Sequence, residues 1–430
     1  MRRIALLATL TCCLTFPASA LAENEMLGAG AWLYHSDPRA VHHKGVTYTG
    51  WITTNGNVRV AAIRHATGRV TRRTIMRGLG VDDHHYPVFH VRSDGRIMAF
   101  YSTHSGKYLP KGRPSRMYYR ITTRPRDIRS WSATRTIPTN TPGGWGHTYP
   151  NVVKADGKLW LFWRGGNWWP TFVTSTDGGN RWSRARNMVL GPIGNKPYFK
   201  YAGRGGTIHM AYTTDTPDAA RTSLFYAQWR NGRLYGADGK LLGRRPLRSG
   251  RGERIYTYRT SLGRGWVYDI ATDAAGRPAI LYITGYDRRN PVFRYAKWTG
   301  SEWKKTRMAS AGRNGSQGYI TGGGTLDHDD PSTVYLSRTV KGVSQVEVWR
   351  TEDDGATWMK TSVTSGTVPS FRPVSPRGLT AFPFVIYLNG RYGSWLSYER
   401  VRVRTTDEAP LFEPRPLSTE GEGVAPAPAG

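Results

Sequence analysis

Cysteine is nearly absent from this chain: the 430 residues include only Cys12 and Cys13, both in an N-terminal segment that we expect to be removed. A mature chain without thiols excludes disulfides and cysteine-ligated metals, even in an export compartment that permits disulfides. Helical periodicity beyond two turns is also missing, as is any later apolar run of the roughly 20 residues that span a membrane. These absences exclude a coiled coil and a membrane-spanning protein.

The first 22 residues have the three parts of a secretory signal peptide. Arg2 and Arg3 form the charged start, residues 4–16 the apolar centre, and residues 20–22 (Ala-Leu-Ala) a small-residue cleavage site. We therefore predict a signal peptide over residues 1–22 and a secreted, extracellular protein.

Acidic residues are scarce, 30 against 61 lysines and arginines, which gives a formal charge of +31. Removal of Arg2 and Arg3 leaves +29, and such a field concentrates polyanions at the protein surface. Acidic polysaccharides, anionic envelopes and extracellular nucleic acid are the polyanions that a secreted protein meets. No recognition helix, zinc finger or RNP signature is present. The charge leaves acidic polysaccharides and anionic envelopes as candidate partners. Of these we expect an acidic polysaccharide, with no nucleic acid or membrane partner, and we expect a monomer.

A turn, usually containing glycine, precedes a short aromatic or β-branched strand seven times, at a mean spacing of about 57 residues. The seven turns are Lys44-Gly45, Asp94-Gly95, Asp156-Gly157, Gly205-Gly206, Ala275-Gly276, Pro331-Ser332 and Asn389-Gly390. Repeats of this length with several short strands indicate propeller blades. We predict an all-β, seven-bladed β-propeller as a single domain over residues 23–412, with six blades as the alternative. Residues 413–430 lack apolar periodicity and are expected to be a disordered tail.

Two segments, residues 175–182 and 351–358, fit the pattern S/T-x-D-x-G-x-x-W, the Asp box of sialidase-like propellers. The aspartate caps a tight turn, the glycine permits its backbone, and the tryptophan packs between blades. This motif predicts structure and carries no information about chemistry.

A second pattern, H-x-x-P, begins at His84, His147 and His328, and a tyrosine precedes the proline in the first two copies. Equivalent positions of successive blades converge around the propeller axis, so we expect these groups to surround one mouth of the channel. The expected ring is His84, Tyr86, His147, Tyr149, Tyr198, Tyr268 and His328. Imidazole, phenol and guanidinium groups there, with His104 and Arg164 from partner strands, suit general acid–base chemistry on an anion. Any single copy of the pattern also fits a histidine that merely bonds a neighbouring loop.

Three further features have a structural reading beside a functional one. The basic segment 248–254 (RSGRGER) could grip a polyanion or be a solvated loop. Residues 327–330 (Asp-His-Asp-Asp) could hold a cation or form a turn. Trp168, Trp169 and Trp266 could stack on sugar rings or belong to the core.

At these residues the chain resembles the BNR-repeat propeller polysaccharide lyases that cleave ulvan, and their relatives that act on rhamnose–glucuronate linkages. The resemblance spans residues 35–400, and D-D-H-x-x-P with a second histidine at His104 is its most specific part. The segments that carry it are 81–105, 147–153, 162–166, 196–203, 266–284 and 326–338.

The resemblance implies roles for individual residues. His84 and His104 match the active-site histidines, Tyr149 the catalytic tyrosine and Arg164 a substrate-binding arginine. Either Tyr198 or Tyr201 matches a further tyrosine. The full expected substrate-binding set is His147, Tyr198, Lys200, Tyr201, Arg204 and His328.

Some residues depart from the family pattern. His85 and Tyr86 replace the asparagines that usually follow D-D-H, and the segment after Tyr212 lacks the family's histidine. A structural metal site that uses cysteine cannot be retained. The exact polymer and any bound metal therefore stay open, and the chemistry requires no cofactor.

We accordingly expect a secreted polysaccharide lyase that cleaves a uronate polymer by β-elimination at the C4–O bond. Arg164, with a protonated histidine, would bind the carboxylate, while Tyr149 or His84 would take the C5 proton. The alternatives are a propeller hydrolase of rhamnose–glucuronate linkages and a non-catalytic propeller that binds acidic glycans.

Overall fold

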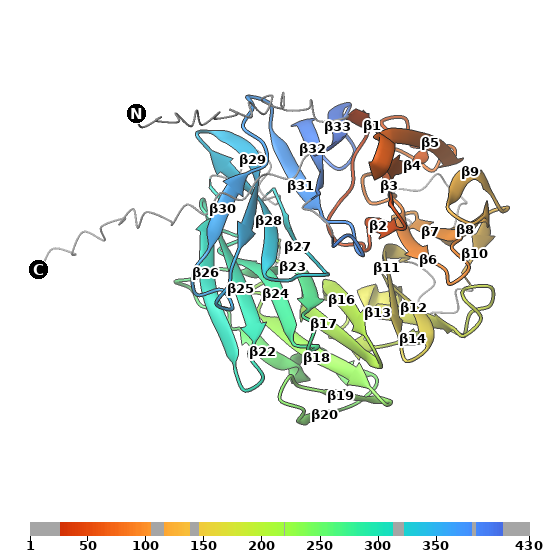
Figure 1. Cartoon of the computed structure of the whole chain (residues 1–430). Coiled ribbons are helices and arrows are strands. Elements are labelled where there is room, and N and C mark those ends of the chain that lie inside the picture. The colour runs from red at the N-terminus through yellow and green to blue at the C-terminus, as the bar shows by residue number, and fades with distance from the viewer. Residues whose placement is uncertain are drawn as a thin grey trace, which may run out of the picture.

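The computed structural model describes residues 26–104, 116–137, 146–218, 220–312, 322–380 and 384–406. Seven β-sheets are arranged around a central axis, as Figure 1 shows. The predicted seven-bladed, all-β propeller is confirmed, and six blades are excluded. The expected signal peptide (1–22) and tail (413–430) lie outside the described residues. No helix in the described ranges is long and apolar enough to cross a membrane.

The first three blades have their strands in chain order from the axis outward. Blade one contains β2 (Ala40–His43), β3 (Val46–Ile52), β4 (Val58–Arg64) and β5 (Arg69–Met76). Blade two contains β6 (Val88–Val91), β7 (Ile97–Ser102), β8 (Met117–Arg124), β9 (Asp127–Trp131) and β10 (Arg135–Thr136). Blade three contains β11 (Thr148–Ala155), β12 (Lys158–Arg164), β13 (Pro170–Ser175) and β14 (Arg186–Asn187).

The next three blades follow the same plan, except that β22 of blade four pairs with β18. Blade four contains β16 (Phe199–Arg204), β17 (Thr207–Thr213), β18 (Leu224–Arg230), β19 (Arg233–Tyr235), β20 (Leu241–Arg244) and β22 (Glu253–Tyr256). Blade five contains β23 (Gly265–Thr272), β24 (Pro278–Thr284), β25 (Val292–Trp298) and β26 (Trp303–Ser310). Blade six contains β27 (Gly324–Leu326), β28 (Thr333–Val340), β29 (Val343–Arg350) and β30 (Met359–Ser362).

The seventh blade joins the two ends of the described chain. It contains β31 (Ser370–Val374), β32 (Ile386–Arg391) and β33 (Arg400–Thr405), and its outermost strand is β1 (Met26–Ala29). β1 pairs antiparallel with β33, with Ala29 opposite Arg402. The ring is therefore closed by backbone hydrogen bonds between β1 and β33.

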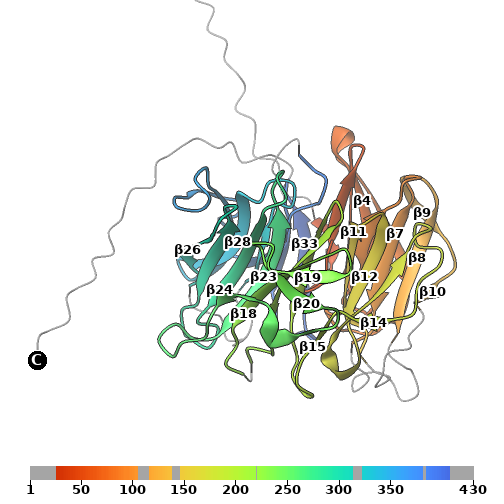
Figure 2. The ribbon, with the colours of Figure 1, turned by 90° about the horizontal axis from the view of Figure 1, so that it is seen from below.

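Small elements lie outside the blades. β15 (Val189–Leu190) pairs in parallel with β21 (Leu247–Arg248), and both lie at the lower side of the ring in Figure 2. Three short 3-10 helices complete the described structure: η1 (His65–Thr67), η3 (Gly166–Trp168) and η4 (Ser249–Arg251).

Burial explains why these sequences form blades. β3 and β24 are buried on both faces, because a neighbouring blade covers each face of the sheet, and their residues are accordingly apolar or small. Outer strands such as β8 alternate buried and half-buried positions over their first half, the pattern of a strand with one covered face.

Both Asp boxes act as the sequence predicts. In the first, Asp177 Oδ1 accepts hydrogen bonds from the amides of Asn180 and Arg181, each at 3.0 Å. Trp182 then packs edge-on against Phe100 of blade two, with 5.8 Å between ring centroids. In the second box, the corresponding tryptophan, Trp358, packs against a tyrosine of blade five. Each box therefore joins its own blade to the preceding one.

Six of the seven predicted turns connect the first and second strands of a blade, but the seventh is wrong. Asn389 and Gly390 lie inside β32, and the first two strands of this blade are joined by residues 375–385 instead. A glycine inside a short strand, such as Gly390 in β32, gives the same sequence pattern as a turn glycine before a strand. The regular plan nevertheless brings the starts of first strands and the ends of second strands to one mouth of the channel.

Candidate functional site

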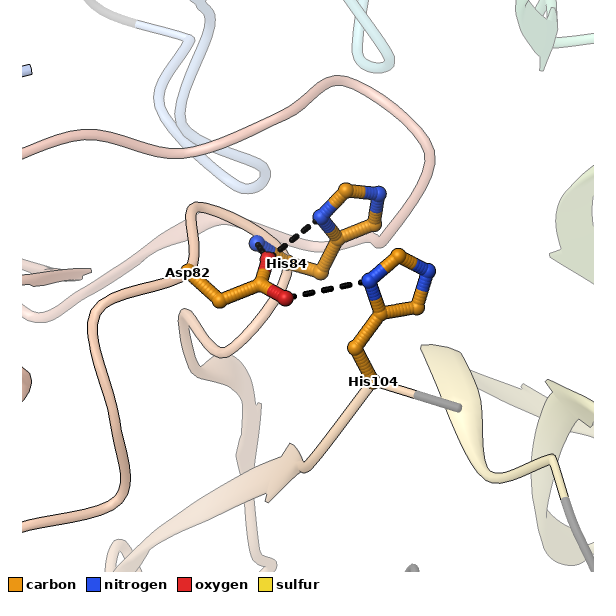
Figure 3. Close-up of side chains that lie close together, drawn as sticks. All are labelled: Asp82, His84 and His104. Carbon is orange, nitrogen blue, oxygen red and sulfur yellow. Dashed lines mark hydrogen bonds and ion pairs between the residues drawn. The ribbon is translucent and has the colours of Figure 1, made fainter. Parts of the chain in front are cut away.

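Asp82 orients two histidines that flank neighbouring strands at one end of blade two. His84 precedes β6, and its Nδ1 lies 2.5 Å from Asp82 Oδ1. His104 follows β7, and its Nδ1 lies 3.0 Å from Asp82 Oδ2. The two rings stack with 3.8 Å between centroids. Figure 3 shows that both second nitrogens point away from Asp82, so one carboxylate fixes the orientation of both rings.

The two stacked histidines differ in protonation. Burial lowers the pKa of His84, but the Asp82 and Asp83 carboxylates outweigh burial and raise it to about 9. Burial and the positive His84 lower the pKa of His104 to about 4. The pKa of Asp82 stays well below its ordinary value despite burial, because His84 and His104 stabilise the carboxylate. Near neutral pH the pair therefore holds one charged and one neutral imidazole.

A second carboxylate, Asp83, supports His84 from behind. Asp83 Oδ1 lies 3.2 Å from His84 Nδ1. Asp83 Oδ2 accepts hydrogen bonds from Arg372 Nη1 at 2.8 Å and from the Tyr392 hydroxyl at 2.6 Å. Asp83 and Arg372 are fully buried, so the seventh blade holds the histidine loop through an ion pair. Trp395, from the same blade, packs edge-on against both histidines.

Arg164 lies at the end of β12 inside a cage of aromatic rings. Its guanidinium carbon is 4.6 Å from the ring centre of Tyr149, 4.8 Å from that of Trp168 and 5.4 Å from that of Tyr198. Its Nη1 donates a hydrogen bond to the Tyr198 hydroxyl at 3.2 Å. Arg164 is 7% exposed, and within the described part of the chain no carboxylate forms an ion pair with it. The cage thus presents a buried cation suited to an incoming anion.

Tyr149 connects the histidine pair with the arginine cage. Its ring centre is 5.5 Å from that of His84, and the Arg164 guanidinium covers its face. Its backbone has φ 65°, a left-handed conformation that is costly for a large residue and is concentrated at functional sites. Burial and Tyr198 raise the pKa of Tyr149 well above its usual value, so its hydroxyl is protonated.

The sequence analysis missed His35, which belongs to this site. Its ring stacks on Trp266 at 5.2 Å and packs against Tyr149 and Tyr198 at 4.9 and 4.5 Å. Burial and the nearby Lys200 lower the pKa of His35 well below its usual value, so it is neutral. Its position just before β2 matches that of His84 just before β6, which is the signal that could have identified it.

Tyr198, rather than Tyr201, is the tyrosine that contacts the cage. Tyr201 stacks on Phe162 at 4.2 Å within the core between blades three and four. Tyr86 and Tyr268 are also core residues: the Tyr86 hydroxyl accepts a hydrogen bond from the Ser36 amide, and Tyr268 packs against a neighbouring tyrosine. These three residues do not line the mouth as expected.

Three other expected substrate-binding residues lie elsewhere. His147 is buried and packs against Trp163, with 6.0 Å between ring centroids. Lys200 is buried and forms an ion pair with Asp37. Arg204 stands at the far end of β16 from Tyr198, about 20 Å along the strand, and donates a hydrogen bond to the Ala274 carbonyl. The ion pair with Asp37 therefore engages Lys200, and distance along β16 removes Arg204 from the site.

His328 does not join His84 at the mouth, because its H-x-x-P pattern stands one strand out of register. The first two copies precede or begin first strands, whereas His328 lies in the turn before β28, a second strand. Its Nε2 is 3.1 Å from Asp269 Oδ1 and 3.5 Å from Arg377 Nη2. The expected ring of seven residues is therefore wrong at this position.

Two groups of residues are candidates for a metal site. The ligand atoms of Asp82, His84 and His104 lie within 4.8 Å of one another, but both histidine Nδ1 atoms already bond the carboxylate. Asp327 Oδ1 accepts the amides of Asp329 and Asp330, which supports the reading of residues 327–330 as a turn. Of the described residues, only the first group brings three such ligand atoms together.

The comparisons with known proteins agree with this architecture. The solved structure of an ulvan lyase of polysaccharide lyase family 25, bound to -[GlcA(1-4)Rha3S]-, has a TM-score of 0.68 and 16% identity, with 90% of this chain and 95% of that chain covered. A second ulvan lyase structure of that family has a TM-score of 0.67 and 17% identity, with 90% and 96% covered. A search of curated protein sequences gave no match. Residues 46–311 match the BNR repeat-containing family, and the chain therefore belongs to that family.

Proposed function

We propose that this protein is a secreted polysaccharide lyase that cleaves a uronate-containing polysaccharide by β-elimination. The observation that carries the proposal is Arg164, a buried cation beside Tyr149 that forms no ion pair with any described carboxylate. A uronate carboxylate in the cage would complete the charge balance. The ulvan lyase whose structure was solved with a glucuronate–rhamnose sugar shares this fold.

Elimination requires that the carboxylate be neutralised, because the C5 proton of a uronate is only weakly acidic. A bidentate contact with Arg164 would stabilise the negative charge that develops as the C5–H bond breaks. His84, charged because its pKa is about 9, adds a second positive group near Tyr149. These two cations favour an enolate-like transition state.

The protonation states of His84, His104 and Tyr149 indicate which group is the base and which is the acid. His84 is protonated at neutral pH and cannot act as the base, whereas His104 is neutral and has an accepting Nε2. The neutral Tyr149 hydroxyl can donate a proton to the leaving O4. The C5 proton passes to His104, the C5–H electron pair forms the C4–C5 double bond, and the C4–O bond breaks as O4 receives the Tyr149 proton.

The carboxylates at the site favour elimination over hydrolysis. Most glycoside hydrolases use two carboxyl groups that flank the scissile bond. Here Asp82 bonds both histidines, and Asp83 bonds Arg372 and Tyr392. Both act as supports for other side chains, which leaves the histidine, tyrosine and arginine as the reacting groups.

The test is to incubate the protein with ulvan and with gum arabic and to follow ultraviolet absorbance beside a reducing-sugar assay. A lyase forms unsaturated uronate ends, so absorbance and reducing ends rise together. New reducing ends without absorbance would identify a hydrolase, and binding without new ends would identify a lectin. Either result would refute the proposal.

A further inference from the structure

An open hollow of about 1030 Å³ lies beside the arginine cage. Trp169 lines it and directly follows Trp168, the residue that packs on Arg164. Its remaining walls come from residues 190–195, Thr214 and residues 246–251, which include the short β15–β21 pair. The hollow therefore continues the candidate site along the same mouth of the channel, over blades three and four.

The walls of the hollow combine the indole ring of Trp169 with arginines that form no ion pair with a described carboxylate. Arg248 and Arg251 are exposed, and no described carboxylate forms an ion pair with either. The one acid of this basic segment, Glu253, points elsewhere and accepts hydrogen bonds from the Ala237 amide and the Trp303 indole. The positive charge of the segment is thus left facing the solvent of the hollow.

Other polar and apolar groups at the hollow are consistent with a carbohydrate chain. Trp169 is half-buried where it lines the hollow. Ile193 is 82% exposed at the rim. The nearby Asp215 is engaged by the backbone amides of Lys196 and Thr216, so its charge is already bonded. An indole ring suits contact with the face of a sugar ring.

We infer that this hollow is a subsite for an anionic sugar neighbouring the reacting uronate, with Arg248 and Arg251 contacting its carboxylate or sulfate ester. The inference rests on the proposed function, because it places the reacting sugar at Arg164. It also gives a role to the basic segment 248–254, for which the sequence allowed either a polyanion-binding segment or a solvated loop. The segment binds a charged group of the substrate next to the sugar that reacts.

The test compares the double variant Arg248→Gln/Arg251→Gln with the control Arg69→Gln/Arg73→Gln on β5, the outer strand of blade one. Both pairs of arginines are exposed, and each double substitution removes two positive charges. The control therefore measures the effect of lowering the net charge of the protein. Affinity for ulvan is measured by calorimetry in a Tyr149→Phe background that does not cleave, and KM and kcat are measured in the otherwise unchanged chain. We expect Kd and KM to rise about five- to tenfold with kcat unchanged for the first pair, and less than twofold for the control.

Desulfated ulvan separates the two sources of the anion. If the loss of affinity disappears on the desulfated polymer, the arginines contact a sulfate ester; if it persists, they contact a second carboxylate. Equal affinities for the two double variants on both polymers would overturn the inference. Absence of cleavage by the unsubstituted chain would refute the proposed lyase instead, while the calorimetric comparison would still decide whether the hollow binds anionic sugars.

Discussion

His84 and His104 stack ring on ring, 3.8 Å apart at their centres, yet their pKa values lie on opposite sides of neutrality. Asp82 bonds both rings, but His84 also has Asp83 beside its Nδ1. The second carboxylate keeps the proton on His84, and this charge suppresses protonation of His104. One imidazole is thereby a fixed cation and its neighbour a proton acceptor.

The first prediction concerns the pH dependence of turnover. We expect kcat/KM to rise as His104 loses its proton near pH 4 and to fall as His84 loses its proton near pH 9. Initial rates of absorbance increase on ulvan between pH 3 and about 10 measure this profile. The Asp82→Asn variant should move the fall at high pH to lower pH, because Asp83 alone then opposes the lowering of the His84 pKa by burial. An upper limb that stays in place would show that another group sets it.

The second prediction concerns the pH dependence of stability. The folded pKa of His84, about 9, exceeds the ordinary value of 6.5, so its contribution is complete below pH 6.5 and lost as pH rises through 9. The shift corresponds to on the order of 3 kcal/mol. Chemical unfolding at pH 6.5 and pH 9.5 should show a larger loss in the unsubstituted chain than in His84→Gln. Equal losses would contradict the charged state of His84.

The third prediction concerns recognition of the carboxylate. Arg164→Ala should lower kcat/KM on a uronate polymer by about 100- to 1,000-fold, because the variant lacks the cation that stabilises the developing charge. Arg164→Lys keeps the charge but loses the planar fork, so it should recover only part of the activity. Tyr198→Phe is the matched control, since it removes the hydroxyl that bonds Arg164 but keeps the cation. A Tyr198→Phe loss as large as that of Arg164→Ala would assign the binding role to the phenol.

The fourth prediction concerns the ion pair behind the site. Arg372→Met removes the fully buried cation that pairs with Asp83 and should cost about 3–5 kcal/mol of unfolding free energy. Tyr392→Phe removes one hydrogen bond to the same carboxylate and should cost about 1 kcal/mol. Arg96→Met, at an exposed pair with Asp94, should change stability by less than about 1 kcal/mol. Denaturant unfolding of all three variants orders these costs; a neutral Arg372→Met would show that Asp83 is protonated.

The sequence predicted the propeller because its signals are local. A turn glycine and an Asp box are each defined within about ten residues, so both motifs and their spacing can be recognised in the sequence without a structure. The site residues that repeat at blade starts, His84 and Tyr149, were found for the same reason. His104 and Arg164 were found at the ends of second strands.

The site residues were predicted wrongly where one blade differs from the others, or where successive side chains of a strand point to opposite faces of the sheet. His328 shares a motif with His84, yet its motif stands before a second strand, and a motif alone does not reveal strand order. Tyr198 and Tyr201 are three positions apart, and only the first faces Arg164. His35 and Arg372 were missed because their contacts join blades that are far apart in the sequence.

The pairing of β1 with β33 has a consequence for biosynthesis. His35 follows β1 near the beginning of the chain, whereas Arg372, Tyr392 and Trp395 reach the histidines from the last blade. A growing chain whose last blade is not yet made therefore lacks the Arg372 and Tyr392 contacts to Asp83, whatever the number of blades already folded. Cleaving ability should emerge in one step, when β33 is complete and β1 pairs with it.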